Sequence, residues 1–102
     1  MDYLFADDAL HRIRDQAAIF DCACPAQLCK QIGDLRELHA YQLSCGRATP
    51  LDSAVHDRVA ATVETAHEAL EHCLRDVLRL EGWDLETLEM PPELLKTRLN
   101  RT

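Results

Sequence analysis

A single stretch, from Pro50 to Glu81, constrains the fold more than any other part of this chain. Its apolar residues follow one another at alternating steps of four and three positions: Val59, Val63, Ala66, Leu70, Cys73, Val77 and Leu80. Because a helix has about 3.6 residues per turn, this spacing places all of them on one stripe of a helix. Pro50 suits the first turn and Gly82 suits the helix end. We predict an amphipathic helix of about 46 Å, with Glu71 and Arg75 paired on its solvent-facing side.

Two shorter stretches show the same spacing and predict two more helices. Residues 5–21 carry the apolar residues Ala6, Leu10, Ile13, Ala17 and Phe20, and residues 25–45 carry Leu28, Ile32, Leu35 and Leu38. The connections between the three helices are short, so neighbouring helices should be antiparallel. We predict an all-α fold, a small antiparallel up-down-up three-helix bundle with helices near 5–21, 25–45 and 50–81. Residues 83–102 should form a C-terminal extension with a short helix from Pro92, and the whole chain, 1–102, a single helical domain.

Composition and charge narrow the possible partners. Hydrophobic residues make up 47% of the chain and charged residues 28%, which is ordinary for a globular protein. The formal net charge of −7 disfavours binding to nucleic acid or to an anionic membrane, since both need a basic face. The first residues lack the basic and apolar regions of a signal peptide, and no apolar run has the length of a membrane span. We expect a cytoplasmic protein without nucleic-acid or membrane partners.

The predicted third helix exceeds the second by about 15 Å, and this difference predicts an interface. The overhanging part near its C-terminal end is the most apolar part of the helix. Either residues 83–90 fold back over it or another chain covers it, because soluble monomers rarely expose such a patch. We predict a homodimer, or a complex with another helical protein, through Leu74, Val77, Leu78, Leu80 and Trp83.

Five cysteines, an odd number, favour free thiols, a metal site or redox chemistry over a disulfide framework. Cys22, Cys24 and Cys29 surround the start of the second helix, where the helix dipole favours thiolates. If the second and third helices are antiparallel about residue 48, Cys29 lies level with His67 and Cys24 with His72. A zinc or iron site, or a redox-responsive thiol site, could then use Cys22, Cys24, Cys29, His67 and Cys73. The spacing matches no common zinc or ferredoxin motif, and buried cysteines often serve only as small apolar residues.

At the other end of the bundle, the same register places His39 level with His56, as a pH-sensitive or metal-sharing pair. Glu64-x-x-His67 has the spacing of half a di-iron site, but the chain lacks a good second half. No nucleophile, base and oxyanion group can be assembled from the sequence, so we expect no enzyme and no cofactor. The sequence favours a self-associating protein-interaction or regulatory module, and the alternative is a metal-binding or thiol-redox-responsive protein.

Overall fold

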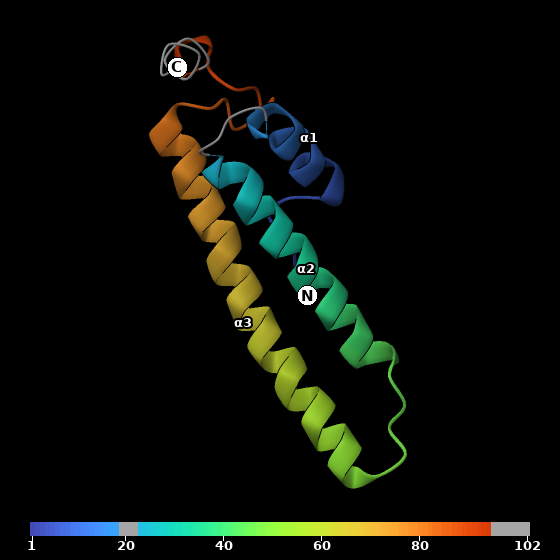
Figure 1. Ribbon diagram of the computed structural model, residues 1–102. Coiled ribbons are helices and arrows are strands. Elements are labelled where there is room, and N and C mark those ends of the chain that lie inside the picture. Colours follow the sequence, from blue (N-terminus) through green and yellow to red (C-terminus); the bar gives the residue numbers. More distant parts are fainter. Residues whose placement is uncertain (19–22, 95–102) are drawn as a thin grey trace.

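Three long helices packed against each other form most of the part of the chain that the structure describes (Figure 1). The computed structural model describes residues 1–18 and 23–94, and no strand occurs within these two ranges. The helices are α1 (Asp7–Ala17), α2 (Cys24–Ser44) and α3 (Pro50–Glu81). In Figure 1, α2 and α3 lie side by side, and α1 lies against the part of α2 nearer its start. The prediction of an all-α protein with three packed helices is confirmed.

The ends of α3 follow from local chemistry and match the predicted range 50–81. The Thr49 hydroxyl accepts a hydrogen bond from the Asp52 backbone N–H at 3.1 Å, and Pro50 occupies the first turn. Gly82 ends the helix in the left-handed conformation, with φ of 85°, a value that side chains other than glycine rarely adopt. The Trp83 N–H then donates to the Leu78 carbonyl oxygen, which fixes the direction in which the chain leaves the helix.

The predicted first helix, 5–21, is longer than α1. The chain is extended at Ala6, and α1 begins only at Asp7. The Phe5 N–H, ahead of the helix, donates to the Glu71 carboxylate. The helix ends at Ala17, and residues 19–22 lie outside the described part of the chain. The second helix begins and ends one residue earlier than predicted, at Cys24 and Ser44.

The hydrophobic core lies at the end of the molecule that α1 covers. It is built from Phe5, Leu10, Ile13, Ala17, Ala23, Ala26, Cys29, Ile32, Leu74, Leu78 and Trp83. After α3 the chain folds back, and Leu88 and Met90 pack against this core. The Gln16 side chain holds the folded-back segment, since its amide nitrogen donates to the Leu88 carbonyl at 2.7 Å and its amide oxygen accepts from the Met90 N–H at 2.9 Å. Residues of the same chain therefore cover the end of α3.

The register between α2 and α3 differs from the predicted one. The Arg36 side chain contacts His67, His39 contacts Glu64, and the Gln42 side chain contacts His56. The predicted pairings of Cys29 with His67 and of His39 with His56 are therefore wrong. The connection causes the shift: Cys45 and Thr49 are both extended, so the chain continues past the end of α2 before α3 begins (Figure 1).

The shifted register also moves the overhang of α3 to its other end. Extending the observed contacts places Cys24, at the start of α2, level with about residue 79 of α3. The unmatched part of α3 is then its first turns, where Leu51 is 72% and Val55 51% exposed. The C-terminal overhang that led to the predicted interface is therefore not present.

The predicted C-terminal helix is described only at its start. Residues 92–94 are helical, and residues 95–102 lie outside the described part of the chain. Between α3 and residue 92, the Asp84 carboxylate accepts hydrogen bonds from the Glu86 and Thr87 N–H groups at 2.8 and 3.0 Å. These two bonds fix the turn that returns the chain toward α1, and they lower the pKa of Asp84.

Candidate functional site

Three ionisable side chains are buried together between α2 and α3. The side chains of Arg36, His67 and Glu71 are only 6%, 1% and 2% exposed. Arg36 Nε donates to His67 Nε2 at 3.0 Å, and Arg36 Nη2 lies 3.1 Å from Glu71 Oε2. Burying charges is costly unless they are paired and hydrogen-bonded, so a buried cluster of this kind needs further partners.

Residues 1–6, which we call the N-terminal strap, supply those partners. Glu71 Oε2 accepts hydrogen bonds from the backbone N–H groups of Leu4 and Phe5, at 2.7 and 3.0 Å. Arg36 Nη2 donates to the Phe5 carbonyl oxygen at 2.6 Å, and Arg36 Nη1 donates to Asp7 Oδ1 at 2.6 Å. The cluster therefore binds both N–H groups and a carbonyl oxygen of the strap backbone.

The Tyr3 side chain covers the cluster from the strap. Its ring centroid lies 3.6 Å from Arg36 Cζ, a cation–π contact, and 5.3 Å from the centroid of the His67 ring. The ring is itself 47% exposed, so it separates the buried guanidinium from solvent. The contacts of Tyr3 add to the backbone hydrogen bonds of the two residues that follow it.

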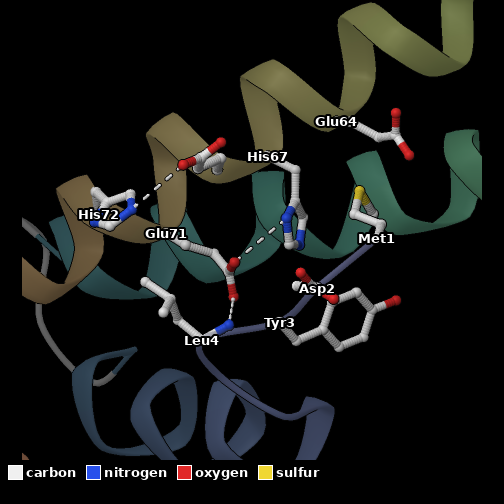
Figure 2. Close-up of a pocket in the computed structure, with 9 residues that line it drawn as sticks. Met1, Asp2, Tyr3, Leu4, Glu64, His67, Glu71 and His72 are labelled. Carbon is white, nitrogen blue, oxygen red and sulfur yellow. Dashed lines mark hydrogen bonds and ion pairs between the residues drawn. The ribbon is translucent and has the colours of Figure 1, made fainter.

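The hydrogen bonds define the protonation state of His67. Nε2 accepts a hydrogen bond from Arg36 Nε–H, so the ring is neutral and carries its own proton on Nδ1. Nδ1 lies 3.4 Å from Glu71 Oε1 (Figure 2). Burial lowers the pKa of His67, the Glu71 carboxylate opposes this shift, and the Arg36 charge adds to it.

A pocket of about 480 Å³ lies beside this cluster, between the strap and α3 (Figure 2). On the α3 side it is lined by Glu64, His67, Glu68, Glu71 and His72. His72 Nδ1 lies 2.9 Å from Arg75 Nη2, and His72 Nε2 lies 3.8 Å from Glu68 Oε1. The pocket walls therefore combine carboxylates and imidazoles, but these groups are already paired with one another, with the strap, or with His39, Arg36 and Arg75.

The structure does not gather the predicted cysteine and histidine ligands. Cys24 and Cys73 are exposed, Cys29 is buried in the core and His67 is bound to Arg36, while Cys22 lies outside the described residues. Within residues 1–18 and 23–94, no group of three or more histidine, cysteine, aspartate or glutamate side chains could hold a metal ion. Cys73 was expected on the inward stripe of the third helix, and its exposure corrects that expectation.

The environment of Cys29 also disfavours thiolate chemistry there. Burial raises the pKa of this thiol to about 12, although the charges of Arg14 and Arg36 oppose the shift. The thiolate is the form that binds metals and attacks disulfides, so Cys29 stays protonated and unreactive at neutral pH. Cys29 acts here as a small apolar residue of the core.

The residues of the predicted interface divide into two groups. Leu74 and Leu78 are fully buried and Trp83 is 5% exposed, all within the core of one chain. Val77 is half-buried and Leu80 is 87% exposed. Leu74, Leu78 and Trp83 are therefore not accessible to a second chain. They were predicted as interface residues because the C-terminal end of the third helix was expected to be uncovered, and that expectation is wrong.

Val77 and Leu80 belong to a longer face of α3. Eight positions at helical spacing follow one side of the helix: Val55, Val59, Thr62, Ala66, Ala69, Cys73, Val77 and Leu80. All eight are exposed or half-buried. The strap contacts Glu71 and His67, which lie on another side of the helix. We call the eight positions the outer face of α3.

The main residues of this candidate site that the sequence did not predict are Arg36, Tyr3 and Glu71. Glu71 was assigned to the solvent-facing side of its helix, and the structure buries it. One signal was available: beyond Leu35, the inner positions of the second helix change from apolar to polar, at His39 and Gln42. A polar contact between two helices was therefore detectable, but its partners in the strap were not.

Comparisons with known proteins add nothing to this description. No protein-family model, curated protein or solved structure matches the chain. In the described part of the chain, no helix is both long enough and apolar enough to cross a membrane.

Proposed function

We propose that this protein is a self-associating protein-interaction module, an antiparallel up-down-up bundle whose partner is a second copy of the same chain. The observation that carries the proposal is the outer face of α3. From Val55 to Leu80 it extends over about 38 Å, and none of its eight residues is charged. Charged residues are depleted from the centres of protein interfaces, so this composition suits a contact surface.

The exposed area of the chain is consistent with a covered face. A compact monomer of 11.6 kDa exposes about 5,800 Å², whereas this chain exposes 6759 Å². The chain therefore exposes about 900 Å² more than a compact monomer of the same mass, as an elongated molecule does. Its extents are 57 × 26 × 18 Å, and a second copy packed along α3 would make the assembly more compact.

The spacing of the outer face favours an isologous, antiparallel contact between two copies. Its residues are nearly symmetric about a point between Ala66 and Ala69: Thr62 and Cys73 lie at equal distances on either side, as do Val55 and Leu80, and Val59 and Val77 differ by one position. In a two-fold antiparallel pair, Thr62 of one copy faces Cys73 of the other. The small residues near the middle of the face let the two helices approach closely.

Charges beside the face support the same register. Arg58 and Asp76 are both exposed, lie on the same flank of the outer face and are nearly equidistant from its centre. The antiparallel pairing places Arg58 of each copy beside Asp76 of the other, which is a favourable contact. Each chain carries a net charge of −7, so two copies repel each other overall, and these two local pairs of opposite charge offset part of that repulsion.

Light scattering tests whether the protein self-associates. We expect about twice the monomer mass of 11.6 kDa at high micromolar concentration. Leu80→Glu and Val77→Glu, which place a charge in the outer face, should each give a folded monomer. Leu43→Glu is the matched control, because Leu43 is 63% exposed but lies on α2, and this variant should remain a dimer. A monomer mass for the unmodified protein at that concentration would refute the proposal.

Cysteine cross-linking tests the register separately. Under mild oxidation, Thr62→Cys should form a disulfide between the introduced thiol and Cys73 of the other copy, identified by peptide mass mapping. Thr65→Cys is the control, since Thr65 is exposed on the same helix but lies outside the outer face, and it should not cross-link to Cys73. Equal cross-linking from both positions would show that the two helices have no fixed antiparallel register.

A further inference from the structure

The other side of α3 carries an inference that does not depend on self-association. We propose that protonation of His67 releases the N-terminal strap, so that Arg36, His67 and Glu71 act as a pH-sensitive latch. Up to Phe5 the strap is held mainly through this cluster: the Leu4 and Phe5 N–H groups donate to Glu71, and the Phe5 carbonyl oxygen accepts from Arg36. The Ala6 carbonyl oxygen, next to the start of α1, accepts from the Leu10 N–H. Its Tyr3 ring also rests on the Arg36 guanidinium.

The latch depends on a single proton. His67 Nε2 must be unprotonated to accept the hydrogen bond from Arg36 Nε, 3.0 Å away. If Nε2 carried a proton, its N–H would point at the N–H of Arg36 Nε, and neither could accept a hydrogen bond. The charged imidazolium of His67 would also lie beside the charged guanidinium of Arg36. Both side chains are almost completely buried, so water cannot screen the repulsion.

The remaining groups near His67 cannot easily compensate a second positive charge. Glu71 is the nearest carboxylate: its Oε1 already faces the Nδ1 of the neutral ring at 3.4 Å, and its Oε2 accepts from the Leu4 N–H, the Phe5 N–H and Arg36 Nη2. The titratable and charged groups around His67 come from all three neighbouring segments: Arg36 and His39 on α2, Glu64, Glu68, Glu71 and His72 on α3, and the amino group of Met1, Asp2 and Tyr3 on the strap.

Arg36 connects the protonation of His67 to the strap. Its guanidinium is planar, so the hydrogen bond from Nε fixes the directions of both Nη groups. These groups hold the Phe5 carbonyl oxygen and Asp7 Oδ1 at 2.6 Å each. If the charged imidazolium displaces Arg36, both contacts with the start of the chain are lost together. Release of the strap would uncover Phe5, which is 9% exposed in the closed state, and open the adjacent pocket.

The latch should be closed at neutral pH and open in acid. Burial, together with the charges of Arg36, His39 and the amino group of Met1, lowers the pKa of His67 below its ordinary value of 6.5. Opening therefore requires a pH below 6.5.

Hydrogen–deuterium exchange of the strap tests the proposal. Protection factors of the Leu4 and Phe5 amides, corrected for the intrinsic effect of pH, should fall as the pH drops below 6.5, by up to about tenfold per pH unit, and should level off once the pH passes the lowered pKa of His67 in the closed state. Amides in the middle of α2 and α3 should keep their protection over the same range. Loss of protection in the helices together with the strap would indicate global unfolding and overturn the latch.

Two variants assign the response to His67. His67→Gln places an amide oxygen near the position of Nε2, where it accepts from Arg36 Nε but does not titrate, so strap protection should become independent of pH between 7.5 and 5. His72→Gln is the control, because His72 lines the same pocket without contacting Arg36, and it should keep the full response. An unchanged acid response in the His67→Gln variant would overturn the proposal.

A measurement on the unmodified protein gives the same answer if His67→Gln does not fold. Nuclear magnetic resonance follows the His67 ring and the Leu4 and Phe5 amides in one pH titration. We expect the ring and the two amides to change with a common midpoint below pH 6.5. A strap that remains bound while His67 is protonated, or that leaves at a different midpoint, would refute the mechanism.

Discussion

Replacement of Arg36 by methionine should be among the most destabilising single changes in this protein. Methionine matches the length of the arginine stem but donates no hydrogen bond, so four contacts are lost: with His67, Glu71, the Phe5 carbonyl and Asp7. The dominant cost is the Glu71 carboxylate, which is 2% exposed and would lose its buried cationic partner. Removing one member of a buried ion pair typically costs about 3–5 kcal/mol. Asp7 adds little, because its side chain is 70% exposed.

A second substitution separates the ion pair from the packing of the stem. Glu71→Leu in the Arg36→Met background removes the unpaired carboxylate, so the double variant should be more stable than Arg36→Met alone. Urea unfolding followed by circular dichroism at one fixed protein concentration measures both free energies of unfolding. A loss below about 1 kcal/mol for Arg36→Met, or strictly additive effects of the two changes, would refute the reasoning.

Three further outcomes follow from the structure. Leu78→Ala should lower the free energy of unfolding by about 2–5 kcal/mol, because Leu78 is fully buried in the core; urea unfolding measures it. Gly82→Ala should lower the free energy of unfolding by about 1–2 kcal/mol in the same assay, because φ at this position is 85°. The added Cβ would make only an ordinary contact, with Pro91 Cγ at 3.8 Å, so the cost comes from the backbone conformation. The folded state disfavours protonation of His67, so the unfolded state binds more protons below pH 6.5; stability should fall as pH drops through 6.5, and less so in His67→Gln.

Hydrophobic periodicity predicted the helices but not which side of the third helix faces inward. The apolar stripe chosen from the sequence includes Cys73 and Leu80, and the structure leaves both exposed. The inward side in the same region is formed by Glu71, Leu74 and Leu78. A long helix with apolar residues on two sides has two consistent stripes, and periodicity alone cannot distinguish the core from an outward face.

The register and the buried cluster depend on parts of the chain without periodicity. A symmetric turn about residue 48 predicted that Cys29 faces His67, but the extended connection shifts the pairing by about two helical turns, so that Arg36 faces His67 instead. Glu71 was assigned to solvent because charged residues are rarely buried. Its burial depends on backbone N–H groups of Leu4 and Phe5, nearly seventy positions earlier, which no local pattern reveals.

The two proposals concern different sides of α3 and can fail independently. The strap is bound through Glu71 and His67, whereas the outer face includes Cys73, Val77 and Leu80. If the latch opens without changing the outer face, the mass measured by light scattering should be the same at pH 7.5 and at pH 5.5. If instead acid dissociates the dimer of the unmodified protein but not of His67→Gln, the strap and the outer face are coupled through the rigid α3 helix, and self-association would be under the control of His67.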